Sequence, residues 1–221
     1  MVADRALRFT FVLLLPVLMW TCGKADTAGP PTVATQFGFK VSPQTSTAGA
    51  VISPAVVVEA RDANGTLVPS FSDSVTISLS RNPGNGTLSG TTTVAAVGGI
   101  ATFANLSIDK SGTGYRLQAS SGALTSVAGT RFDILAGAAT HLAFTVQPGT
   151  DAAGIPIAPA VQVTAQDSLG NVATNFTGLV TLAITSGTGT SGAVLSGQAT
   201  LAASAGIVTF STLSVDKVGS A

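Results

Sequence analysis

Hydrophobic and polar residues alternate with a period of two along most of the chain after residue 35. In residues 56–61 the apolar set is Val56, Val58 and Ala60, and the residues between them include Glu59. This spacing is typical of a β-strand that packs one face on a core, because successive side chains point to opposite faces. The spacing of an amphipathic helix is absent, so the pattern predicts an all-β protein in which Glu59 faces water.

The same alternation returns about a hundred residues later, because one module is written twice. Residues 39–79 recur as residues 144–184, and residues 88–112 recur as residues 195–219, with 32 identities in 66 positions (17 of 41 plus 15 of 25). Inward positions are kept while outward positions change, as a buried face requires. The offset between the copies changes by two within residues 187–192, which predicts a loop there, since insertions are tolerated in loops.

Clusters of Gly, Asn and Asp separate these strands at short intervals and predict turns. About seven short strands in about 100 residues favour a Greek-key sandwich of the immunoglobulin type. We therefore expect tandem immunoglobulin-like β-sandwiches, the first in residues 36–136 and the second in residues 140–221. The second copy has no counterpart of residues 115–136, so we expect it to be truncated, without its last two strands. Tyr115, the only tyrosine, is expected to form a tyrosine corner with backbone just upstream.

The first 35 residues differ from the rest. Arg5 and Arg8 precede a short apolar stretch at residues 9–20, which is too short to span a hydrocarbon core of about 30 Å and is typical of a secretion signal. Residues 1–21 are therefore predicted to be a signal peptide, and residues 22–35 a flexible tether.

Cys22, the only cysteine, follows the apolar stretch directly. This position resembles the lipobox of bacterial lipoproteins, which implies cleavage before Cys22 and a lipid attached to its thiol. Met19, Trp20 and Thr21 depart from the usual lipobox residues. An ordinary signal, cut a few residues later, is the alternative. Either interpretation predicts export, to the cell envelope and outer membrane surface if lipid-anchored or to the extracellular space.

A second resemblance covers residues 36–221. The pattern PAV.V.A.D..G in residues 54–65, the sequence GIATF in residues 99–103 and the pair Asp109 and Lys110 resemble bacterial immunoglobulin-like repeats of the invasin and intimin kind. Such repeats occur in adhesins, in stalks and beside the catalytic domains of secreted enzymes. The resemblance implies the type of module and leaves these roles open.

Composition and motifs argue against several functions. Six Arg and four Lys balance nine Asp and one Glu without clustering, so no basic surface for nucleic acid is predicted. His141 is the only histidine, and its counterpart is Gln36, so the repeats share no chemistry that uses it. No catalytic, cofactor or metal site is predicted. Asp62 and Asp167 each supply one carboxylate to a turn, whereas calcium needs six to eight oxygens. Both aspartates are therefore expected to bond turn backbone.

These observations favour a non-enzymatic spacer or adhesion protein that needs no cofactor. Its partners would be other surface proteins or glycans, and its contact with a membrane would be the lipid at Cys22. The phenylalanines recur as pairs in apolar settings, for example Phe39 with Phe144, and are predicted to lie in the cores, which disfavours a sugar-binding module. An accessory region of a larger secreted enzyme is the remaining alternative.

Overall fold

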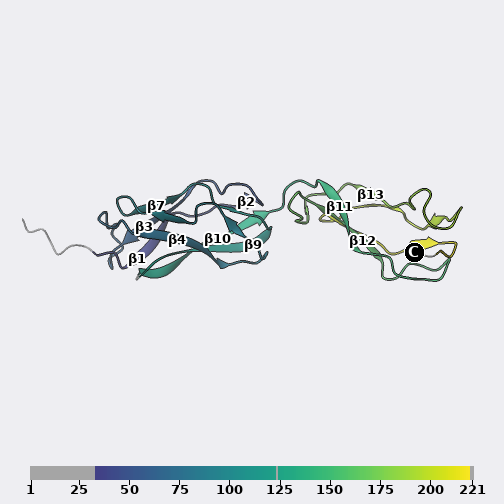
Figure 1. Cartoon of the computed structure of the whole chain (residues 1–221), viewed down its shortest axis with the longest axis horizontal. Helices are drawn as coiled ribbons and strands as arrows, with labels where there is room; N and C mark the ends of the chain where they lie inside the picture. Colours follow the sequence, from purple (N-terminus) through teal and green to yellow (C-terminus); the bar gives the residue numbers. More distant parts are fainter. Residues whose placement is uncertain (1–32, 123, 220–221) are drawn as a thin grey trace, which may run out of the picture. The chain divides into compact units, whose positions relative to one another are not determined.

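The computed structural model describes residues 33–122 and 124–219, and the regular structure in this part of the chain is entirely β. Figure 1 shows the strands of the first repeat, coloured purple to teal, around one core. They are β1 (Gln36–Val41), β2 (Ser46–Thr47), β3 (Val56–Arg61), β4 (Ser74–Arg81), β5 (Leu88–Ser89), β6 (Thr93–Ala95), β7 (Ile100–Phe103), β8 (Ser107–Ile108), β9 (Gly112–Ser121) and β10 (Leu124–Leu135).

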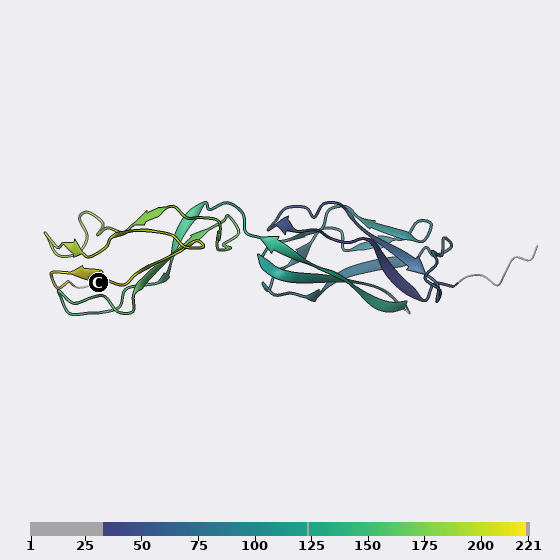
Figure 2. The same cartoon turned by 180° about the vertical axis from the view of Figure 1, so that it is seen from behind.

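The first repeat folds as an immunoglobulin-like sandwich. Strands β1, β3 and β7 pair antiparallel in one layer, and β6, β4, β9 and β10 follow one another in the other, with β2 paired to β10. Strand β10 also meets β1, in parallel, at the pair Gln36 and Thr125. The long ribbons of β9 and β10 lie side by side in both views (Figure 2). Strand β9 therefore lies between β4 and β10.

The core of the first repeat is built by the inward positions of the period-two pattern. Val56 pairs with Phe103 and Val58 with Ala101, and all four are at most 1% exposed. Leu117 covers them from the opposite layer and is also fully buried. Burial of one such valine or leucine side chain stabilises the fold by about 1.5 to 3 kcal/mol, so the inward set carries most of the apolar stabilisation.

Tyr115 forms the predicted corner. Its side chain is fully buried, its hydroxyl donates a hydrogen bond of 2.8 Å to the Lys110 carbonyl, and its ring lies 6.1 Å from that of Phe132. Burial raises the pKa of the Tyr115 hydroxyl above its usual value. The loop before β9 is therefore fastened to the core by one side chain.

The expectation that Glu59 faces water is wrong. Its side chain is buried, because Lys40 of β1 lies 3.0 Å away on one side and Arg61 lies 3.1 Å away on the other. The guanidinium of Arg61 lies over Gly38, where a methyl group would collide with it. The pKa of Glu59 lies below its usual value. The ammonium of Lys40 lowers this pKa most, burial raises it, and the guanidinium of Arg61 lowers it again.

The second repeat begins with the same arrangement. Its strands are β11 (His141–Val146), β12 (Val161–Gln166), β13 (Leu179–Thr181), β14 (Leu195–Ser196), β15 (Thr200–Ala202), β16 (Ile207–Phe210) and β17 (Ser214–Val215). Strand β12 pairs with β11 and β16 as β3 pairs with β1 and β7. Residues 187–192 lie in an irregular segment without strand, which confirms the predicted loop.

The two repeats differ where β9 and β10 lie. In the first repeat β9 pairs with β4 through Ile77 and Leu79, and β4 is eight residues long. Their counterparts, Leu182 and Ile184, have no partner strand among the described residues, and β13 is only three residues long. A strand without its neighbour loses half of its ladder hydrogen bonds, which explains the shortening.

Candidate functional site

The repeated turns after β3 and β12 each hold an aspartate that bonds turn backbone, as predicted. The Asp62 carboxylate accepts hydrogen bonds from the amides of Asn64 and Thr66, at 2.9 and 2.8 Å. Asp167 accepts the equivalent bonds from Leu169 and Asn171. One carboxylate thus fixes each turn.

In the second repeat this turn also contacts the first repeat, and both repeats belong to one compact unit of the chain. The Asn171 side chain donates a hydrogen bond of 3.0 Å to the Asp109 carbonyl and accepts one of 3.0 Å from the Ser111 amide. Asp167 accepts a further bond, of 2.9 Å, from the amide of Gly137 in the linker. Asp167 is only 3% exposed and Asn171 only 5%.

Leu169 completes this contact, which we call the joint. Lys110 Nζ donates a hydrogen bond of 2.7 Å to the Leu169 carbonyl. A methyl group built on Gly49 of the first repeat would lie 2.8 Å from Leu169 Cδ1, so the leucine side chain lies directly against this glycine. Charged, polar and apolar contacts therefore hold the two repeats together at one place.

The Asp167 carboxylate is kept ionised inside the joint. Burial alone would raise its pKa, but the hydrogen bonds from the Asn171 side chain and amide, and from the amides of Gly137 and Leu169, outweigh that effect. The pKa of Asp167 therefore lies below its usual value. An ionised carboxylate accepts all of these bonds at once, whereas a protonated one would lose at least one acceptor position.

Asp109 and Asp216 bond backbone at equivalent corners of the two repeats. No ion pair joins Asp109 to Lys110, or Asp216 to Lys217, in the described residues. Instead Asp109 accepts a hydrogen bond of 2.6 Å from the Thr87 amide, and Asp216 accepts the equivalent bond from Val194. A carboxylate and its neighbouring lysine point to different partners here, so each aspartate fastens its corner through backbone.

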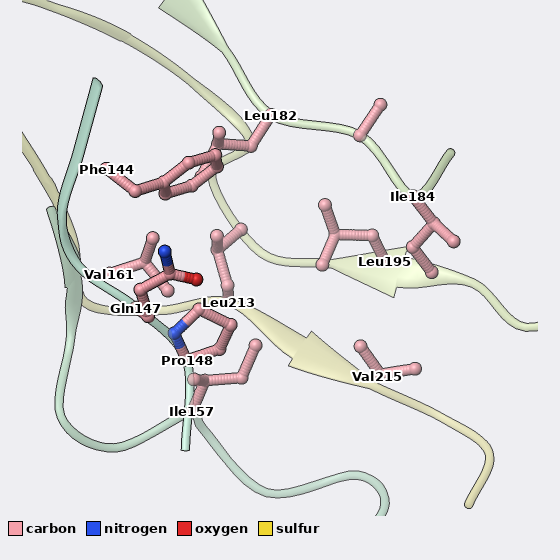
Figure 3. A pocket seen from close by; sticks show the side chains of 11 residues that line it. Phe144, Gln147, Pro148, Ile157, Val161, Leu182, Ile184, Leu195, Leu213 and Val215 are labelled. Atoms are coloured by element: carbon pink, nitrogen blue, oxygen red, sulfur yellow. The ribbon is translucent and has the colours of Figure 1, made fainter. Parts of the chain in front are cut away.

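A second candidate site is an open apolar cavity of about 260 Å³ in the second repeat. Figure 3 shows the Phe144 ring beside Leu182, and Pro148 next to Ile157 at another part of the cavity. In the first repeat the corresponding face is covered by β9 and β10, and the Phe39 ring lies against Gly129 of β10. The cavity is thus the place of two strands that have no counterpart in residues 141–219.

The prediction that Phe144 belongs to the core is wrong. Phe144 is 51% exposed and Leu142 is 50% exposed, whereas Phe37, the counterpart of Leu142, is 3% exposed. The residue pattern is the same in both repeats. What differs is the presence of β9 and β10 over it, so a local pattern alone did not reveal the exposure.

The remaining predicted residues do not gather into a site. His141 begins β11, is exposed, and its Nδ1 lies 3.0 Å from the hydroxyl of Thr140. No group of three His, Cys, Asp or Glu side chains suited to a metal occurs in the described ranges. Those ranges also contain no helix long and apolar enough to cross a membrane. Cys22, the signal peptide and most of the tether lie outside them.

The joint was not predicted from the sequence. One signal was present: Asn171 and Leu169 stand where the first repeat has Thr66 and Asn64. These differences lie in an otherwise preserved turn. They place a carboxamide and an apolar side chain in the second repeat, which follows another repeat in the chain.

No family model matches the chain, and no curated protein is similar enough to count as a relative. Among solved structures, the Escherichia coli adhesin FdeC is 18% identical, with 83% of this chain and 56% of that chain covered and a TM-score of 0.43. Domains 4–9 of the surface layer protein SbsC are 16% identical, with 86% and 30% covered and a TM-score of 0.33. This chain spans about half or less of these proteins. Similarity at this level says nothing of what the chain binds.

Proposed function

We propose that this chain is a non-enzymatic spacer or adhesion protein of a bacterial cell surface, in which immunoglobulin-like repeats are held in series by the joint. The joint is the observation that carries this proposal. Repeats connected by a short linker alone are expected to move freely relative to one another. Here the buried side chains of Asp167 and Asn171 bond both the linker and the preceding repeat, which supports a stiff connection.

Stiffness is tested by measuring one distance between the repeats. Thr102 and its counterpart Thr209 are both exposed, so each accepts a spin label through a cysteine, with Cys22 replaced by Ser. Pulsed electron spin resonance should give one narrow distance distribution. Asn171→Thr, which restores the residue of the first repeat, should broaden it.

Thr66→Asn makes the reverse exchange in the first repeat, away from the joint, and serves as the matched control that leaves the distribution narrow. A broad distribution in the parent chain that Asn171→Thr does not alter would refute the spacer function. Surface location is tested separately, by whether added protease removes the protein from intact producing cells. Full protection of the protein there would exclude a surface role.

A further inference from the structure

The surface of the first repeat that receives the joint is repeated in the second repeat. We call Gly49, Asp109, Lys110 and Ser111 the first docking face. Their counterparts in the repeat alignment form the second docking face: Gly154, Asp216, Lys217 and Val218. Three of these four positions are identical, and the fourth, Ser111 or Val218, acts in the joint only through its backbone amide.

The same internal hydrogen bonds shape both docking faces. The Gly49 amide donates to the Ile108 carbonyl at 2.8 Å, and the Gly154 amide donates to Val215 at 2.8 Å. Both glycines have a positive φ, of 76° and 80°. The aspartate-to-backbone bonds of the two corners also match, at 2.6 and 2.8 Å. The second docking face therefore presents the same carbonyl, amide and glycine groups.

The second docking face is uncovered in the described part of the chain. Asp216 and Lys217 are exposed, and Val218 is 75% exposed, whereas Asp109, Lys110 and Ser111 are half-buried in the joint. Nothing lies within 4 Å of a methyl group built on Gly154. Lys217 Nζ donates instead to the carbonyl of Ser191 in its own repeat.

We infer that the second docking face binds the turn of another immunoglobulin-like repeat with the sequence Asp-x-Leu-Gly-Asn, as in residues 167–171. A carboxamide is required because one side chain must donate to the Asp216 carbonyl and accept from the Val218 amide. A leucine two residues after the aspartate would lie over Gly154, as Leu169 lies over Gly49. The first repeat of a second copy does not qualify, because its turn carries Asn64 and Thr66 at these two positions.

This inference rests on the proposed serial arrangement and extends it to a further partner. Gly112 is the counterpart of Gly219 in the repeat alignment, so the test chain joins residues 1–218 directly to a second copy of residues 112–221. The added copy supplies the last two strands of the second sandwich and a further Asp-x-Leu-Gly-Asn turn. Amide hydrogen exchange at Val218 is then compared with the same chain carrying Asn171→Thr in the added copy alone. The hydrogen bond to the carboxamide should slow exchange at Val218 by about tenfold.

Equal exchange at Val218 in the two chains would overturn the inference. Exchange at Ser111 in the parent chain and its own Asn171→Thr variant reports on the existing joint. If exchange at Ser111 is slower in the parent chain than in its variant while exchange at Val218 is equal in the two extended chains, the spacer function is supported and the second docking face is refuted. Equal rates at both amides would refute both the spacer function and the second docking face.

A second measurement covers the case in which the extended chain does not fold. Asn64→Leu with Thr66→Asn gives the first repeat of the 221-residue chain the required turn. Sedimentation should then show stronger concentration-dependent association than for the parent chain, and Gly154→Val should return the association to the parent's level. A variant that associates no more strongly than the parent chain up to millimolar concentration, or one whose added association survives Gly154→Val, would contradict the inference.

Discussion

Asn171 of the second repeat donates to the carbonyl of Asp109 and accepts from the amide of Ser111, both at 3.0 Å, and so closes the contact between two repeats with a single side chain. A carboxamide donates through its NH₂ group and accepts through its oxygen, and both groups lie in one plane. Thr66, its counterpart, donates only its backbone amide, to Asp62. The specialised residue thus stands in the repeat that has a neighbour to meet.

The joint should weaken in acid because of Asp167. A carboxylate whose pKa is lowered in the folded state adds stability above its unfolded pKa of about 3.9, and that stability is lost as the pH falls through the lower, folded pKa. Distance distributions between labels on the repeats should therefore stay narrow from pH 7 to about 5 and broaden below about pH 4.

The Asp167→Asn variant, which removes the charge, should already give a broad distance distribution at pH 7. Asp62→Asn is the control. A distribution for Asp167→Asn at pH 7 that is as narrow as the parent's would exclude this role of Asp167.

Tyr115→Phe should lower the free energy of unfolding of the first repeat by about 1 kcal/mol, because only the hydrogen bond to the Lys110 carbonyl is lost. Tyr115→Ala should lower it by about 3 kcal/mol or more, because a cavity opens in the core. Urea denaturation followed by circular dichroism measures both. An unchanged midpoint for Tyr115→Ala would falsify the corner role.

Phe144 and Phe39 are counterparts whose surroundings differ, and they form a matched pair. Phe144→Ser should cost little stability and reduce both self-association and binding of a hydrophobic dye, since the ring is half-exposed on an open apolar face. Phe39→Ser should destabilise the first repeat by about 2 to 4 kcal/mol, because β10 covers that ring. Sedimentation and urea denaturation distinguish the two effects. Equal losses of stability for both variants would mean that the second repeat closes over Phe144.

Cys22→Ser should release the protein from membranes if the cysteine carries the lipid anchor. Two or three acyl chains give stable anchoring, whereas one is marginal. Intact-mass measurement of the protein from a host with the lipoprotein pathway checks the modification directly. An unmodified mature protein that starts downstream of Cys22 would support the ordinary signal peptide instead.

The sequence by itself determined which residues form strands and which face of each strand is apolar, because a period of two is local and survives in any packing. It also determined the two aspartate turns and the Tyr115 corner, since their partners lie within a few residues.

Only the tertiary structure decided how these pieces meet. Glu59 is buried because Lys40 and Arg61 contact it from β1 and from its own strand. The alternation in residues 56–61 does not predict the contact with Lys40. Phe144 is exposed although its pattern matches that of Phe39, because exposure depends on strands far away in the sequence. The joint depends on two loops about sixty residues apart, and such a contact is fixed by packing between repeats, which no local spacing encodes.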